Sequence, residues 1–154
     1  MFREMRRFKQ QMTDEEAQAV LARRTYGVLG VIGNDGYSYT VPVNYIYDDG
    51  KILFHCAKAG HKLDAIRANE KVSFCVVDEE MLDRKNFATY YSSVICFGRA
   101  RVLEDDEERL AACRRFCMKM YPYTDAVEAE IGKHPNAFYM VKISIDHITG
   151  KRKP

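Results

Sequence analysis

The stretch "YSYTVPVNYIYDDGKILFHC", residues 37–56, decides the fold class. Apolar side chains recur at every second residue from Tyr39 to Tyr47, a spacing that predicts a β-strand. Pro42 cannot donate to a strand ladder, so this strand is expected at a sheet edge, or bulged or bent there. The "DDG" of residues 48–50 predicts a tight turn into a second strand, "KILFHC". The stretch therefore indicates antiparallel sheet.

A helix and another strand are predicted before this hairpin. Thr13 and Glu16 have the spacing of a capping box, which begins a helix over residues 13–24. An apolar strand follows at residues 28–33, and "NDG" at residues 34–36 is a strong tight-turn signal. Together with the hairpin above, these segments predict three successive antiparallel strands that form a meander.

Three more strands are expected after the hairpin. The segment 71–77 is apolar at nearly every position, which predicts a strand covered on both faces. Residues 78–88 are polar and predicted to be irregular. A long strand follows over residues 90–104, with Gly98 placed for a bulge or sharp bend, and a last strand alternates over residues 137–148.

The remaining apolar periodicity is helical. A short helix is predicted around Leu63 and Ile66, a longer one over residues 105–121 that Pro122 ends, and a weaker one over residues 126–132. The fold class is thus mainly β with flanking helices. Six strands, mostly linked by hairpins and bent at two points, predict a small closed or split antiparallel barrel in a single domain, residues 1–154.

Composition excludes several classes of protein. The 154 residues are 47% hydrophobic and 30% charged, which argues against disorder and fibrous repeats. The net charge of +2 comes without a long basic stripe, so no nucleic-acid partner is expected. No segment approaches the roughly 20 apolar residues of a membrane span, and no export signal is recognised, so we expect a cytoplasmic protein.

The five cysteines are expected to be small core side chains in a reducing compartment, because most of them lie in apolar runs. Cys56 is less certain, since it borders a turn. Cys113 and Cys117 lie one helical turn apart, but no second pair or suitably spaced histidine accompanies them. No metal site is therefore predicted.

The segment "FHCAKAGHKLDAI", residues 54–66, contains the candidate site. It passes from a strand through a short turn into a helix, and it holds two of the four histidines. A helix that begins near Gly60 offers unpaired N–H groups and the positive end of its dipole, to which Lys62 adds a charge. Phosphate is the anion such a turn suits, with His61 as a second donor. The alternative is that Lys62 extends into solvent and His61 is an ordinary surface residue.

Three stretches together resemble the pyridoxamine 5'-phosphate oxidase-like flavoproteins, and within them the branch that includes nitroimidazole-resistance proteins. The stretches are "VPVNYIYDDGKILFHCAKAGHKLDAIRANEKVSFCVVD", "YYSSVICFGRARVLED" and the terminal "DHITGK", so the resemblance spans about residues 12–151. It implies a six-stranded split barrel that forms a homodimer, with one FMN in each of two clefts at the subunit interface.

The resemblance also implies which residues bind FMN. In the oxidase proper an Arg-Lys pair holds the FMN phosphate, and His61 and Lys62 match that pair here, so the contact is expected to be weaker and more sensitive to pH. The other implied flavin neighbours are Val41, Pro42, Val43, Asn44, His55, Cys56, Ala57, Gly60, Ser92 and Ser93. The alternatives are an edge-strand bend at Pro42, a solvated amide at Asn44 and an outward strand face at Ser92 and Ser93.

The sequence departs from the oxidase at its C-terminal end. "DHITGKRKP" lacks the arginine- and histidine-bearing segment that grips the vitamin substrate, so a different, small electron-poor substrate such as a nitroaromatic compound is implied. Electrons would come from NAD(P)H, which must visit the flavin cleft transiently because no Gly-rich dinucleotide fingerprint is present. His55 is the predicted catalytic residue for proton transfer; the alternative is a histidine that only packs on the ring.

Two other functions stay open from the sequence. The same scaffold could hold flavin or haem without turnover, since His55, His61 and His147 are possible haem ligands. A structural dimer with an empty cleft is the third reading, because a fold does not by itself determine a function.

Overall fold

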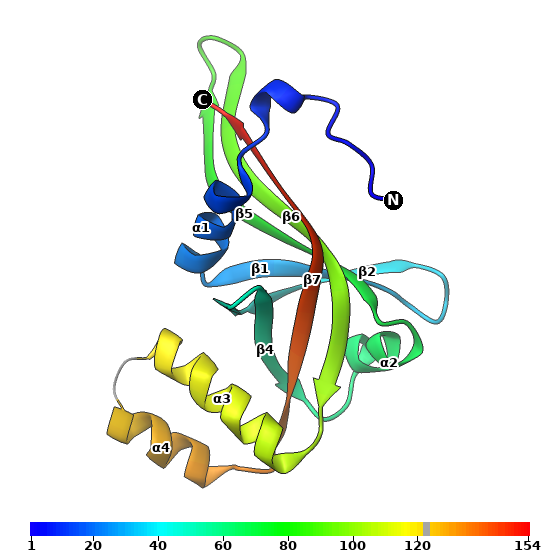
Figure 1. Ribbon diagram of the computed structural model, residues 1–154, viewed down its shortest axis with the longest axis vertical. Coiled ribbons are helices and arrows are strands. Elements are labelled where there is room, and N and C mark those ends of the chain that lie inside the picture. Colours follow the sequence, from blue (N-terminus) through cyan, green and yellow to red (C-terminus); the bar gives the residue numbers. More distant parts are fainter. Residues whose placement is uncertain (122–123) are drawn as a thin grey trace.

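Seven strands form one antiparallel sheet in the computed structural model, which describes residues 1–121 and 124–154 (Figure 1). In chain order the elements are a short 3-10 helix (Phe8–Gln10), α1 (Asp14–Arg23), β1 (Tyr26–Ile32), β2 (Ser38–Asn44), β3 (Ile46–Asp48), β4 (Lys51–Ala57), α2 (His61–Ala68), β5 (Lys71–Asp83), β6 (Ala88–Leu103), α3 (Asp106–Met120), α4 (Thr124–Lys133) and β7 (Phe138–Lys153). The mainly β architecture with flanking helices confirms the predicted fold class.

The predicted strand across residues 39–47 is interrupted, and the predicted meander is wrong. The sheet order is β2-β1-β5-β6-β7-β4-β3, so β2 and β3 lie at opposite edges although they are consecutive in the chain. Between them Tyr45 is fully buried; its N–H donates to the Thr25 carbonyl (3.0 Å) and its hydroxyl to the Leu21 carbonyl (2.8 Å). These bonds turn the chain out of the ladder, which makes seven strands instead of six and leaves the barrel open.

Several local predictions are confirmed. Thr13 and Glu16 form the capping box of α1, each side chain accepting from the other's backbone N–H at 2.9 and 3.2 Å. Pro42 lies on an edge strand, as a residue without an N–H requires. The β6–β7 pairing shifts at Gly98, where a Cβ would lie 2.4 Å from the Ser144 carbonyl oxygen. A glycine is therefore needed for this bend.

The predicted irregular segment 78–88 is wrong. Strands β5 and β6 continue as a paired ribbon from Glu79 and Ser92 out to Asp83 and Ala88, with one register shift next to Asp78. This ribbon projects from the body of the molecule beside the C-terminus (Figure 1). Backbone pairing holds it, so it needs no apolar face.

Strand β5 is also not covered on both faces within the chain. Val72, Phe74 and Val76 are buried, whereas Val77 is 61% exposed and Cys75 is only partly covered. The apolar residues on one face of β5 pack inside the barrel. Those on the other face lie on a surface that is uncovered in a single chain.

Two apolar clusters occupy the two sides of the sheet. The larger one fills the barrel beneath α1 and α2, and the smaller one lies between β3, β4, β7 and the α3–α4 pair. Cys56, Cys96 and Cys113 are buried in these clusters, and all five thiols are free. Cys75 and Cys117 are only partly buried, so the predicted core role is confirmed for Cys96 and Cys113 and extends to the less certain Cys56.

The predicted helices are present. Asp105 caps α3 by accepting from the Glu108 N–H, and the weaker helix corresponds to α4. Pro122, predicted to end α3, lies outside the described residues. Over residues 1–121 and 124–154, every helix is too short or too polar to cross a membrane.

Candidate functional site

The turn between β4 and α2 has an open backbone. Gly60 is the N-cap of α2 with φ 137° and ψ 167°, and its carbonyl accepts from the N–H groups of Leu63 and Asp64. No side chain caps the helix, so the earlier N–H groups of the first turn are left for another acceptor. A Cβ built on Gly60 would meet nothing within 4 Å. The space above this turn is therefore free for a ligand.

The two basic side chains predicted at this turn are both present at the start of α2. His61 is exposed and its ring lies 4.4 Å from the Tyr39 ring on β2, which ties the helix start to the edge strand. Within the described part of the chain, neither His61 nor Lys62 has a carboxylate at ion-pair distance. The positive charge at this helix start is uncompensated, which suits an anion.

His55 lies on the face of β4 that packs against α3, six residues before His61. Its ring meets the Phe116 ring edge-on, with centroids 5.4 Å apart. Burial, together with the charge of Lys62, lowers the pKa of His55 below its ordinary value. The lowered pKa favours the neutral imidazole, which can accept a proton.

Cys56 and Ala57 complete the end of β4. Cys56 points into the barrel, and burial raises the pKa of its thiol. Ala57 is exposed at the last strand position, opposite Phe138. Since the Cys56 side chain is turned inward, only its backbone can face a ligand in the turn.

Strand β2 brings the four predicted flavin-lining residues to an edge of the sheet. Val41 and Val43 are half-buried against the barrel core, while Pro42 and Asn44 are exposed on the other side. Because β2 pairs only with β1, its far edge presents unpaired backbone groups. The Asn44 amide nitrogen donates to the Thr25 carbonyl at 3.0 Å, which leaves the amide oxygen toward solvent.

Pro42 starts a row of side chains that crosses the open side of the sheet, called here the outer face. The row continues through Val28, Cys75, Ile95 and Thr149 on β1, β5, β6 and β7. Two residues further along their strands, Asn44 and Ser93 lie on this same face. Three strand spacings separate them, about 14 Å, so they do not touch within one chain.

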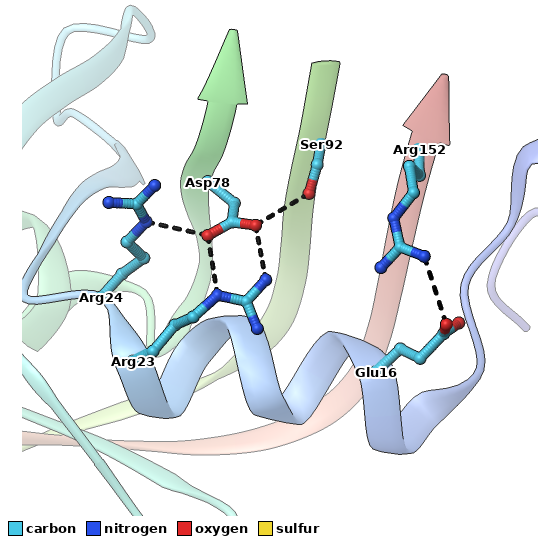
Figure 2. A network of polar contacts seen from close by, with 6 residues as sticks. All are labelled: Glu16, Arg23, Arg24, Asp78, Ser92 and Arg152. Atoms are coloured by element: carbon cyan, nitrogen blue, oxygen red, sulfur yellow. Dashed lines mark hydrogen bonds and ion pairs between the residues drawn. The ribbon is translucent and has the colours of Figure 1, made fainter. Parts of the chain in front are cut away.

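Ser92 points the opposite way and belongs to a polar network that the sequence analysis missed (Figure 2). Its hydroxyl donates to Asp78 at 3.1 Å, and Asp78 also accepts two bonds from Arg23 and one from Arg24, at 2.5–2.9 Å. Hydrogen bonds from the Arg23 guanidinium, and to a smaller extent from the Arg24 guanidinium and the Ser92 hydroxyl, lower the pKa of Asp78 to about 2. Burial of the carboxylate acts in the opposite direction and raises it. The only sequence signal was an acidic residue that directly follows an apolar strand.

The two predicted serines therefore have different surroundings. Successive residues of a strand point to opposite faces, so only Ser93 reaches the outer face. Ser92 is 2% exposed and engaged with Asp78, at the residue where the β5–β6 register shifts. Within one chain the structure brings together the β4–α2 turn and β2, and it leaves both serines away from them.

The outer face is hollowed at its other end by a groove of about 680 Å³, also missed from the sequence. Small residues on three neighbouring strands, Thr40, Gly30 and Ser73, form its floor. Phe97 and the N-terminal Phe2 line it on one side. This volume is in the range of small-molecule sites.

Comparison with known proteins identifies the family of this chain. The model of the family described as pyridoxamine 5'-phosphate oxidase matches residues 13–152. This chain belongs to that family. Among curated proteins, none matches the sequence significantly.

Solved structures share the oxidase-family fold along nearly the whole chain. An FAD-binding protein from Mesorhizobium loti is 25% identical with a TM-score of 0.72, covering 94% of this chain and 97% of that one. A flavocytochrome from Azotobacter vinelandii is 20% identical with a TM-score of 0.80, covering 98% and 72%. A candidate 5-nitroimidazole antibiotic resistance protein from Bacteroides thetaiotaomicron is 20% identical with a TM-score of 0.73, covering 92% and 86%. The predicted family and split-barrel fold are confirmed.

Proposed function

We propose that this chain is an FMN-dependent oxidoreductase that reduces a small electron-poor substrate. The observation that carries the proposal is the charge of Lys62, which has no carboxylate partner among the described residues, with the His61 ring beside it, at the open turn of Gly60 and next to β2. The start of α2 suits a terminal phosphate, and the unpaired edge of β2 suits the hydrogen-bonding rim of a flat ring.

The fit to a flavin can be described residue by residue. The N–H groups of the first turn of α2, with His61 and Lys62, would hold the phosphate. Backbone of Cys56 and Ala57 would lie along the ribityl chain, and Val41 to Asn44 would border the ring with unpaired backbone groups and the Asn44 amide oxygen. His55 stands near the end of β4, and its imidazole can exchange a proton.

The exposed outer face supports a homodimer as part of the proposal. This face exposes several large apolar side chains, among them Tyr26 (58%), Val77 (61%) and Ile95 (43%). Such a patch marks an interaction surface, and a two-fold interface joins the same patch of two copies. If two copies pack through the Tyr26 and Val77 end of this face, the groove at its other end stays open, and Ser93 of one copy would approach β2 of the other across their separation of about 14 Å within one chain.

The chemistry belongs to the cofactor. When bound, FMN supplies two-electron transfer from NAD(P)H to a small acceptor such as a nitroaromatic compound. The protein residues bind and orient the reactants, and His55 holds or moves a proton near the reacting atoms. The likeness to a candidate nitroimidazole-resistance protein supports this choice of substrate class.

Titration of the purified protein with FMN tests the site, with quenching of flavin fluorescence as the signal. Replacing both His61 and Lys62 by glutamine should raise the Kd at least tenfold, because charged groups contribute about 1.5–3 kcal/mol each to phosphate contacts. Lys58→Gln is the matched control: Lys58 lies in the same turn but over the Tyr139 ring. An unchanged Kd in the double variant would refute the assignment.

The absorption spectrum and turnover separate the alternatives. Flavin bands support the proposal, a Soret band indicates a haem protein, and a colourless protein that refuses FMN indicates a structural role. With FMN bound, His55→Gln should slow NAD(P)H-dependent reduction of a nitroaromatic compound while FMN content stays normal. Equal turnover in the two proteins would remove His55 from the chemistry.

A further inference from the structure

A flat aromatic platform lies beside the groove of the outer face. Phe97 on β6 and His147 on β7 are cross-strand partners whose rings are nearly parallel, at 10°, with centroids 6.4 Å apart. We call this pair the aromatic platform. Phe2, from the N-terminal segment, stacks on both rings, 4.5 Å from His147 and 5.7 Å from Phe97. The chain thus already places one flat ring on this surface.

The groove next to the platform is deep because its floor lacks side chains. A Cβ on Gly30 would lie 2.5 Å from the Ser73 hydroxyl, so a larger residue at position 30 would displace that side chain. Thr40 continues the floor to the edge strand β2. The groove therefore runs from the aromatic platform to the strand that borders the proposed flavin.

Two cations stand directly opposite each other in the groove wall. Lys71 and Arg99 are cross-strand partners on β5 and β6, an arrangement that like charges disfavour. Arg99 is shared between Asp146, which also lines the groove (3.3 Å), and Glu70 (3.4 Å). Over the described residues Lys71 has no carboxylate within 4.0 Å. Since Arg99 already has two carboxylate partners, an anion here would chiefly provide the partner that Lys71 lacks.

We propose that this groove binds an adenosine 5'-diphosphate moiety. The purine takes the place of Phe2 on the aromatic platform, since its two fused rings can cover both Phe97 and His147. The diphosphate lies between Lys71 and Arg99, and Asp146 is placed to accept hydrogen bonds from the ribose hydroxyls. Phe2 then acts as an internal competitor that leaves the platform when the nucleotide enters.

Two molecules could bring this moiety to the outer face. One is the NAD(P)H of the proposed function, on which this reading rests; the sequence offers it no Gly-rich fingerprint, and the groove would hold its adenylate half. The other is FAD, which has only two phosphates. Both would lie between Lys71 and Arg99, so FAD would bind in place of FMN and would not also hold a phosphate at His61 and Lys62. The two molecules place the same chemistry in the groove, and the experiment separates them.

Calorimetric titration of the flavin-free protein with ADP tests the groove directly. We expect binding that weakens about tenfold in Lys71→Gln, as one charge-assisted contact is lost, and that tightens in Phe2→Ala. Phe97→Ala should weaken it through lost stacking. Arg101→Gln, two residues beyond Arg99 and paired with Glu108, is the matched control and should bind as the parent does. Absence of ADP binding, or equal binding in Lys71→Gln and the parent, would overturn the proposal.

Two further measurements identify the source. If NAD(P)H is the ligand, Lys71→Gln raises the KM for NADH in the FMN-loaded protein but leaves that for reduced nicotinamide mononucleotide, which lacks the adenylate half. If FAD is the ligand, Lys71→Gln weakens FAD binding and leaves FMN binding unchanged. If the groove does not bind ADP, FMN binding at His61 and Lys62 can still be measured. If the FMN proposal is wrong, ADP binding can still be measured, so the two outcomes are distinguishable.

Discussion

Replacing Asp78 by asparagine removes the charge at the centre of the network in Figure 2 while keeping the shape of the side chain. Asp78 is 6% exposed and joins the end of α1, through Arg23 and Arg24, to Ser92 on β6. Both arginines are about half exposed, so water can solvate them when the carboxylate is gone. The cost should therefore be smaller than that of a fully buried ion pair, about 3–5 kcal/mol.

The magnitude follows from the lowered pKa of Asp78. A shift from 3.8 to about 2 corresponds to about 2–3 kcal/mol of folding free energy at neutral pH. Because the folded pKa lies below the unfolded one, this contribution is complete above about pH 4 and is lost as the pH falls toward 2. At pH 3 about half of it remains.

Urea denaturation of the parent and of Asp78→Asn, at pH 7 and pH 3, measures this difference. We expect the variant to lose about 2–3 kcal/mol at pH 7 and about half as much at pH 3. Arg152→Gln is the control, since its pair with Glu16 is exposed and should contribute at most about 0.5 kcal/mol. A loss below that level in Asp78→Asn, or one that does not change with pH, would refute the reasoning.

Three other predictions concern the turn and the thiols. Gly60→Ala should lower the free energy of unfolding by about 1–3 kcal/mol, because φ 137° suits only glycine; an unchanged urea midpoint would contradict this. In an NMR titration His55 should have a pKa below its ordinary value, and Lys62→Gln should raise it by removing a like charge; an identical midpoint would exclude that influence. Burial and the neighbouring Cys117 raise the pKa of Cys113 to about 12. At pH 8 Cys113 should therefore react with iodoacetamide far more slowly in the native than in the unfolded protein, as mass spectrometry can follow, and equal rates would contradict its burial.

The fold was predictable from the sequence where a local interaction decides the backbone. The capping box at Thr13 and the bend at Gly98 are of this kind, since each depends on residue types within a few positions or on the lack of a Cβ. The interruption at Tyr45 was not predictable, because its bonds go to Leu21 and Thr25, distant in sequence. Likewise the ribbon of β5 and β6 is held by backbone pairing, which leaves no apolar pattern to recognise.

The candidate site was predictable in the same uneven way. The β4–α2 turn is a single continuous segment, so its glycine, histidine and lysine could be read together, and the structure keeps them together. Ser92 and Ser93 looked equivalent in the sequence, but strand alternation sends one toward Asp78 and the other to the outer face. The groove joins residues from six separate segments, which periodicity within one segment cannot reveal.

Tyr45 also determines how the barrel can change its width. Since β2 and β3 lie at opposite edges, the seam between them is crossed by covalent chain at Tyr45 and not by a ladder of hydrogen bonds. We expect the two edge strands, β2 and β3, to move apart by a change in the twist of the one continuous sheet once the bonds from Tyr45 to Leu21 and Thr25 are released. A ligand too large for the present barrel interior would then be accommodated by displacement of β2 and β3 at this seam, without any loss of secondary structure.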